Sequence, residues 1–248
     1  MKHTFRSSTI LLAFSTLALG ACASADDADS GREVAQQTSA PIQGGAADTA
    51  HPEVGLVYTQ SKSFCSGTLI TPTVVLTAGH CVGDLEGFYL GAGAAGQTWP
   101  DLSKYDRHGV ADAAGVQFDN DIALVHLSEP VDGVTPFASY GDGATKGDSC
   151  TMVGYGTHNE GSKEYVGERR SATASVSSIT STYVTVKWTD GIADHGDSGG
   201  PLICNEQIVG TTHNHTDGDY PNHKVENYGR ITSAIAKKIA AQIAAWGD

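Results

Sequence analysis

The chain has 248 residues, of which 40% are hydrophobic and 17% charged, and its formal net charge is −13. That apolar fraction is large enough for a folded core, which excludes a wholly disordered chain. The acidic balance argues against nucleic acid as a partner, because phosphate binding requires a basic surface.

Residues 1–21 have the features of a secretory signal peptide. Lys2 and Arg6 precede the apolar run ILLAFSTLAL, which is too short to span a membrane as a helix. The sequence LGAC (19–22) resembles a bacterial lipoprotein signal, in which cleavage precedes the cysteine and the cysteine is lipidated. The alternative is an ordinary signal peptide in which Cys22 is incidental. We favour the lipoprotein interpretation, which predicts an exported protein, either an outer-membrane lipoprotein or a secreted one, with membrane contact only through the lipid.

The next segment, residues 22–41, is small, polar and acidic, with one valine and no aromatic residue. Such a composition does not build a core, so we expect a tether or a pro-segment. The third and last segment, residues 42–248, is expected to form the folded domain.

Five cysteines are present, and an odd number in an exported protein requires an explanation. Lipidation of Cys22 would account for one of them. The others allow three disulfide pairings in an oxidising compartment, and they lack the close spacing of a zinc site. They are Cys65, Cys81, Cys150 and Cys204.

From residue 42 onward, short β-prone runs alternate with clusters of Gly, Pro, Asn and Asp. This spacing is typical of a barrel or a sandwich. The expected strands are 54–58, 67–70, 73–77, 122–127, 183–188 and 207–212.

The tail of the chain has a different pattern, in which isoleucine recurs every four residues. This period places the isoleucines in one stripe on a helix, which Thr232 or Ser233 is able to cap. The nearby Lys237 and Lys238 favour a docked terminal helix over a membrane anchor. The stripe consists of Ile231, Ile235, Ile239 and Ile243, with Trp246 close behind.

Two stretches resemble ligand sites without meeting their requirements. LGAGAAG (90–96) contains the glycine pattern of a dinucleotide site, but Pro100 follows where a helix should begin, so we expect a loop. The loop THNHTDGDYPNH (212–223) has three histidines, but their spacing matches no standard metal site and favours a polar surface loop. We therefore expect no cofactor and no metal.

The strongest chemical signal is GDSGGP, residues 196–201, where adjacent glycines hold a serine on a sharp bend. A serine hydroxyl becomes a nucleophile when a histidine takes its proton and a carboxylate orients that histidine. His80, in VVLTAGHC, ends an apolar run, and Asp121, in DNDIALVHL, opens another. Taken separately, these residues are also consistent with a tight turn, a strand-end histidine and a strand-capping aspartate.

TAGHC, DNDIALVHLSEPV and GDSGGP, in this order, closely resemble the chymotrypsin/trypsin family of serine endopeptidases. The resemblance covers residues 42–248: IQGG (42–45) matches the mature amino terminus of the family, and YGRITSAI (228–235) matches the run into its terminal helix. It implies an all-β fold of two six-stranded antiparallel β-barrels with a C-terminal α-helix. It also implies protein or peptide substrates and a monomer.

The resemblance implies roles for individual residues. Ser198 would attack the scissile carbonyl, His80 would transfer the proton, and Asp121 would orient His80. The backbone N–H groups of Gly196 and Ser198 would form the oxyanion hole.

It also implies an activation step, in which Asp197 would bind the free amino group of Ile42. The cysteine pairs that it implies are Cys65 with Cys81 and Cys150 with Cys204.

The sequence departs from the family pattern at two places. Pro41 precedes Ile42, where the family usually has Arg or Lys, so either another activating peptidase cuts here or the tether stays attached. Ile192 occupies the pocket-floor position at which trypsin-like members carry aspartate. Glu226 and His213 lie near other pocket positions, so preference for a basic, an acidic or a large apolar residue stays open.

Two other functions are weighed against a serine endopeptidase. One is a catalytically silent binding lipoprotein on the protease fold, which the unusual Pro41 favours. The other is a surface adhesin of unrelated β-fold, which would require the ordered motif matches to be chance.

Overall fold

The structure of this chain is a computed structural model that describes residues 42–94, 99–160, 163–215 and 225–248. The predicted signal peptide, tether and lipidated Cys22 lie outside these ranges, as do residues 216–223 of the histidine-containing loop. None of the helices in the described residues is long and apolar enough to cross a membrane.

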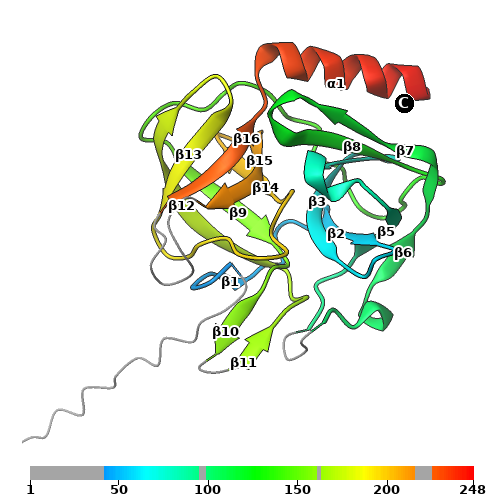
Figure 1. The fold of residues 1–248 in the computed structure, drawn as a ribbon, viewed down its shortest axis with the longest axis horizontal. Helices are drawn as coiled ribbons and strands as arrows, with labels where there is room; N and C mark the ends of the chain where they lie inside the picture. Colours follow the sequence, from blue (N-terminus) through cyan, green and yellow to red (C-terminus); the bar gives the residue numbers. More distant parts are fainter. Residues whose placement is uncertain (1–41, 95–98, 161–162, 216–224) are drawn as a thin grey trace, which may run out of the picture. The chain divides into compact units, whose positions relative to one another are not determined.

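Antiparallel strands dominate the described residues, together with three short 3₁₀ helices and one α-helix (Figure 1). The first half of the domain contains β1 (Ala46–Ala47), β2 (Val54–Thr59), β3 (Phe64–Thr71), β4 (Val74–Ala78), η1 (Gly79–Cys81), β5 (Leu85–Leu90), η2 (Leu102–Lys104), β6 (Asp106–His108), β7 (Val110–Phe118), η3 (Asp119–Asp121) and β8 (Ile122–Leu127). The second half contains β9 (Ser149–Gly154), β10 (His158–Glu160), β11 (Lys163–Tyr165), β12 (Arg170–Ile179), β13 (Tyr183–Trp188), β14 (Pro201–Cys204), β15 (Gln207–His215), β16 (Val225–Arg230) and α1 (Ser233–Trp246).

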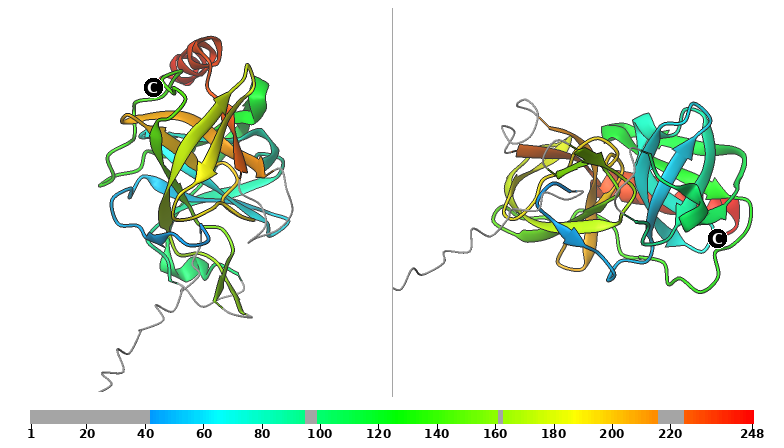
Figure 2. Two further views of the ribbon diagram at one scale, coloured as in Figure 1. Left: turned by 90° about the vertical axis from the view of Figure 1, so that its left-hand side faces the viewer. Right: turned by 90° about the horizontal axis from the view of Figure 1, so that it is seen from below.

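Apart from β10 and β11, which pair as a separate two-stranded sheet, the strands form two barrels, which Figures 1 and 2 show as separate rings of strands. In the C-terminal barrel the order β12-β13-β16-β15-β14-β9 closes on itself through pairing of β12 with β9, and β1 pairs with the first two residues of β12. In the N-terminal barrel the order is β6-β5-β2-β3-β4-β8-β7, which is nearly closed. The predicted fold class, all-β with two barrels and a C-terminal α-helix, is confirmed.

Several strands are buried on both faces, which explains their continuous apolar sequences. Val57 of β2 and Val75 of β4 point into the N-terminal barrel. Their neighbours Leu56 and Leu76 point the opposite way, into a second core that also includes Ile208 of β15. Because successive side chains of a strand alternate between faces, a strand between two cores is apolar at every position. This second core joins the two barrels.

The C-terminal helix docks through the predicted isoleucine stripe. The hydroxyl of Thr232 accepts the backbone N–H of Ile235 at 3.3 Å and caps the helix, which begins at Ser233. The ring of Trp246 stacks on His126 of β8, with ring centroids 4.6 Å apart and planes 4° apart. The helix, which is the last element of the chain, therefore packs against the N-terminal barrel (Figure 1). The buried positions of the stripe are Ile235, Ile239 and Ile243, and Ile231 is buried just before the helix.

Candidate active site

His80 and Asp121 are brought together at the end of β4. The chain leaves β4 through the 3₁₀ turn η1, and His80 lies at its centre. The Nδ1 atom of His80 lies 2.7 Å from Oδ2 of Asp121, and the backbone N–H of His80 donates to Oδ1 at 2.8 Å. The hydrogen bond that His80 donates to Asp121 raises the pKa of His80 against the opposing effect of burial. The carboxylate thus fixes both the backbone and the ring of His80.

Asp121 is presented by a strained turn between β7 and β8. Asn120 and Asp121 have φ values of 61° and 57°, a left-handed conformation that is uncommon for residues other than glycine. The amide of Asn120 donates to the carbonyl oxygens of Ser181, at 3.2 Å, and Arg230, at 3.0 Å. Both of these partners belong to the C-terminal barrel, so the turn that carries Asp121 is anchored across the two barrels.

Ser198 lies on the loop between β13 and β14 and is held against the N-terminal barrel. Its carbonyl oxygen accepts the backbone N–H of Ser66 at 2.7 Å. The next residue, Gly199, has φ +80°, and a Cβ atom there would lie 2.1 Å from the hydroxyl oxygen of Thr77. Only glycine fits this close approach to the end of β4. Within the described residues the hydroxyl of Ser198 has no hydrogen-bond partner.

Two backbone N–H groups beside this serine are also available. The carbonyl oxygen of Gly196 accepts a hydrogen bond from the hydroxyl of Ser66 at 2.9 Å, which fixes the peptide that follows it. In the part of the chain that is described, the N–H groups of Gly196 and Ser198 donate to no acceptor. Unpaired N–H groups of this kind are able to bind an oxyanion.

Asp197 is fully buried behind the serine. Its carboxylate accepts the backbone N–H of Gly156 at 2.7 Å and that of Asp194 at 2.9 Å. Burial raises the pKa of Asp197 to about 8. Ile42 is 1% exposed and packs in the core of the C-terminal barrel, but residue 41 lies outside the described ranges. The predicted pairing of Asp197 with the amino group of Ile42 therefore stays a prediction.

A pocket of about 240 Å³ opens beside Ser198. Glu226 of β16 lines it and is only 1% exposed. Ile192, the expected floor residue, is buried and donates its backbone N–H to Gln43 at 2.8 Å. It is not among the described residues that line the pocket, which are Ala193, Asp194, His195, Ser198, Thr212, His213, Asn214 and Glu226.

His213 lines the same pocket and also contacts Asp121. Its Nδ1 atom lies 2.6 Å from Oδ2 of Asp121, the oxygen that already contacts His80. Sequence reasoning placed His213 near the pocket and missed this contact. No motif carries the signal for it, because the contact depends on how β15 pairs with β16.

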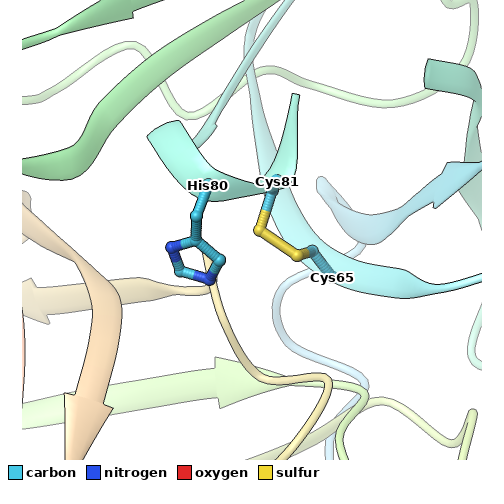
Figure 3. Close-up of side chains that lie close together, drawn as sticks. All are labelled: Cys65, His80 and Cys81. Carbon is cyan, nitrogen blue, oxygen red and sulfur yellow. A yellow bond between two sulfur atoms is a disulfide. The ribbon is translucent and has the colours of Figure 1, made fainter. Parts of the chain in front are cut away.

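Disulfide bonds join Cys65 to Cys81 and Cys150 to Cys204, the pairs that the resemblance implies. His80 and Cys81 are neighbours in η1, and their side chains project to different sides, the imidazole to one and the disulfide to the other (Figure 3). The disulfide ties η1 to β3 and thereby limits movement of His80.

Three side chains of the site have ligand atoms close enough to share a metal ion. These atoms of His80, Asp121 and His213 lie within 4.8 Å of one another. The Nδ1 atom of each histidine is already at hydrogen-bond distance from the carboxylate of Asp121, so hydrogen bonding accounts for the cluster. Residues 95 and 96 of the glycine-rich stretch lie outside the described residues, and the next described element after β5 is the three-residue η2, so the predicted loop stays a prediction.

Comparisons with known proteins show the family and the fold of this chain. A curated relative, the thrombin-like enzyme cerastocytin of Cerastes cerastes, is 32% identical over 206 residues, which cover 71% of this chain and 77% of the relative. Trypsin of Squalus acanthias is 30% identical over 167 residues, with 59% and 72% covered. The solved structure of human heparin binding protein superposes with a TM-score of 0.63 at 20% identity and covers 80% of this chain. The trypsin family model matches residues 42–236, and the chain belongs to this family of serine proteases.

Proposed function

We propose that this protein is a serine endopeptidase that hydrolyses peptide bonds through Ser198, His80 and Asp121. The observation that carries the proposal is the pair of hydrogen bonds between His80 and Asp121, together with Ser198, which lines a pocket. Since Nδ1 of His80 donates to Asp121, Nε2 is left as the base for the serine proton. Membership of the trypsin family supports the same reaction.

The reaction would proceed through an acyl-enzyme. Oγ of Ser198 attacks the scissile carbonyl carbon while Nε2 of His80 takes its proton, and His80 then gives that proton to the leaving amine. In the second half of the reaction, water attacks the acyl carbon while His80 takes its proton, and His80 then returns the proton to Ser198 as the acyl group is released. Asp121 stabilises the imidazolium that forms in both steps. The described residues show no hydrogen bond between His80 and Ser198, and we expect one to form when substrate binds.

The N–H groups of Gly196 and Ser198 would stabilise the oxyanion of the tetrahedral intermediate. A single donor of this kind typically contributes about 3 kcal/mol to the transition state. The two N–H groups have no acceptor among the described residues, so no internal bond has to break before they act.

The residue before the scissile bond would be lysine or arginine. Glu226 and Asp194 line the pocket, and the carboxylate of Glu226 also contributes to the raised pKa of Asp197, after burial and Asp194. A pocket with acidic walls attracts a cationic side chain and repels a carboxylate. Glu226 would thus take the role that aspartate at the position of Ile192 has in trypsin-like members.

A preference for glutamate is disfavoured by the contacts of His213. Its Nδ1 lies against Asp121, and its Nε2 lies 3.3 Å from the hydroxyl of Tyr183. Both nitrogens have partners, so neither is available for a substrate carboxylate.

Export, lipidation of Cys22 and activation by cleavage before Ile42 belong to the same proposal. They rest on the sequence pattern of residues 1–42. Because Pro41 precedes the cleavage site, the activating peptidase would not be trypsin-like, and self-activation is not expected.

A fluorophosphonate probe tests the proposal, because it reacts only with an activated serine. We expect wild-type protein beginning at Ile42 to be labelled once, on the peptide that contains Ser198, and Ser198→Ala to remain unlabelled. A folded wild-type protein that is not labelled would instead support the alternative, a binding protein on the protease fold.

A further inference from the structure

We infer that His213, the second histidine of this site, is a positioning residue that holds Asp121 in the orientation that His80 requires. The inference rests on the proposed function, because it assigns a role in the reaction of Ser198. It differs from the role in substrate selection that the sequence suggests for His213.

The contact between His213 and Asp121 defines the proton positions. Oδ2 of Asp121 lies 2.7 Å from Nδ1 of His80 and 2.6 Å from Nδ1 of His213. An ionised carboxylate only accepts hydrogen bonds, so each imidazole must carry its proton on Nδ1. With the backbone N–H of His80 on Oδ1, the carboxylate receives three N–H donors. Its two oxygens are therefore fixed from two directions.

The local backbone explains why His213 reaches Asp121. The pairing of β15 with β16 changes register between Thr212 and Asn214, so His213 is the extra residue of a β-bulge. Bulges redirect side chains and are common next to active sites. A regular strand would direct the side chain of this residue differently.

Tyr183 of β13 holds the imidazole of His213 in place. The two rings stack with centroids 5.2 Å apart and planes 16° apart, and the tyrosine hydroxyl lies 3.3 Å from Nε2. The side chain of His213 is 23% exposed, so solvent reaches it only in part. Its ring therefore has one supported orientation, in which Nδ1 faces Asp121.

This contact also crosses the two barrels. Asp121 and His80 belong to the N-terminal barrel, whereas His213 belongs to the C-terminal barrel, which also carries Ser198. His213 thus ties the orienting carboxylate to the barrel that supplies the nucleophile. Loss of this donor would let the Asp121 side chain rotate, and His80 would lose its fixed position relative to Ser198.

Kinetics of three variants, with a fourth as the control for stability, test the inference. His213→Ala removes the donor, and His213→Asn keeps one, because an asparagine amide nitrogen can occupy the place of Nδ1. We expect kcat to fall about tenfold or more in His213→Ala with KM within about twofold, and His213→Asn to recover most of the loss. Tyr183→Phe keeps the stacked ring and removes only the hydroxyl, so its loss should be smaller. Thr232→Ala, in the distant helix cap, controls for lowered stability alone.

The pH profile separates positioning from packing. The titratable groups that face His80 in the described structure are Asp121, on η3, and His213, on β15. The N–H group of His213 partly neutralises the Asp121 carboxylate. Without this donor, the carboxylate interacts more strongly with protonated His80 and raises the pKa of His80. The acid limb of kcat/KM should therefore move to higher pH in His213→Ala but not in His213→Asn. An unchanged kcat and pH profile in His213→Ala, or a defect confined to KM, would overturn the inference.

NMR tests the contact independently of activity. Imidazole N–H protons bonded to a carboxylate appear far downfield, and we expect two in wild-type protein and one in His213→Ala. A single signal in wild-type protein would overturn the inference. Wild-type protein with both signals but no peptidase activity would overturn the proposed function instead.

Discussion

The carboxylate of Asp197 accepts the backbone N–H of Gly156 at 2.7 Å in a fully buried site. The N–H of Asp194 satisfies the other oxygen. Two hydrogen bonds do not offset the cost of burying this charge, because burial raises the pKa of Asp197 to about 8. Among the described residues, the hydrogen bonds to this carboxylate come only from two backbone N–H groups, and in the proposed activation a free amino group on Ile42 would supply a cation.

Asp197→Asn is expected to change stability in opposite directions before and after cleavage. In protein that keeps residues 22–41, the folded state binds the Asp197 proton more tightly than the unfolded state, so stability falls as pH rises from about 4 to 8. Removing the charge should raise stability at pH 8 by an amount on the order of a few kcal/mol. In protein that begins at Ile42, the same substitution would remove the proposed ion pair between Asp197 and the amino group of Ile42, so it should destabilise. Urea unfolding of the four proteins measures both effects, and equal signs would contradict the assigned pairing.

Asp48 is expected to give an acid-dependent contribution to stability. It is 4% exposed, and its carboxylate lies 2.8 Å from Nδ1 of His51 and 3.5 Å from Nε of Arg169. Burial raises the pKa of Asp48, but the hydrogen bonds and charge of His51 outweigh it and lower the pKa to about 2. The stabilisation is present above the unfolded value near 3.8 and is lost as pH falls through about 2.

Asp48→Asn measures this contribution. The pKa of His51 is raised by its hydrogen bond to Asp48, so the pair also loses stability at high pH. The contribution of protonated His51 is complete below pH 6.5 and is lost as pH rises through the pKa of His51 in the folded protein. The variant should therefore be less stable by about 2 kcal/mol between pH 4 and 6, and the difference should shrink towards pH 2 and pH 8. Denaturant unfolding across this range checks it, and a difference independent of pH would argue against an ionised pair.

Glu226→Gln should reduce cleavage after lysine and arginine selectively. The glutamine keeps nearly the same shape but removes the charge that would bind the substrate cation. Loss of a desolvated charge pair typically costs about 2 kcal/mol or more, which is roughly a 30-fold loss in kcat/KM. Peptides with an uncharged residue at that position should change little. An equal loss for all peptides would place Glu226 in the structure of the pocket and not in substrate selection.

Thr232→Ala should destabilise the protein by about 1 kcal/mol, because the helix loses the side chain that caps its first turn. Ser233→Ala is the matched control, since Ser233 is the first helical residue and not the cap. Thermal unfolding of both variants compares them directly. A larger effect of Ser233→Ala would reassign the cap.

The strands and the helix could be predicted where a single pattern decides the outcome. Residues 122–127 form β8 with the expected bounds, because they combine β-propensity with burial. The isoleucine stripe predicted α1, because isoleucine at every fourth position gives a helix one apolar face. The pairing of His80 with Asp121 followed from the order of the motifs, although spacing alone would not have joined residues 41 positions apart.

Other features depend on tertiary structure and could not be predicted from the sequence. His213 reaches Asp121 through a bulge in β15, and nothing in TTHNH marks the change of register. Ile192 stands at the sequence position expected for the pocket floor, yet its backbone pairs with Gln43, and it is not among the described residues that line the pocket. β1 is two residues long and is formed by pairing with β12, so its own sequence, Ala-Ala, predicts no strand.

The most direct test of the central claim is digestion of a peptide library, read by mass spectrometry. Protein beginning at Ile42 should cleave the library after lysine and arginine, and Ser198→Ala, prepared in the same way, should leave it intact. Cleavage by both proteins would point to a contaminant. A folded wild-type protein that cleaves nothing would contradict a serine endopeptidase built on Ser198, His80 and Asp121.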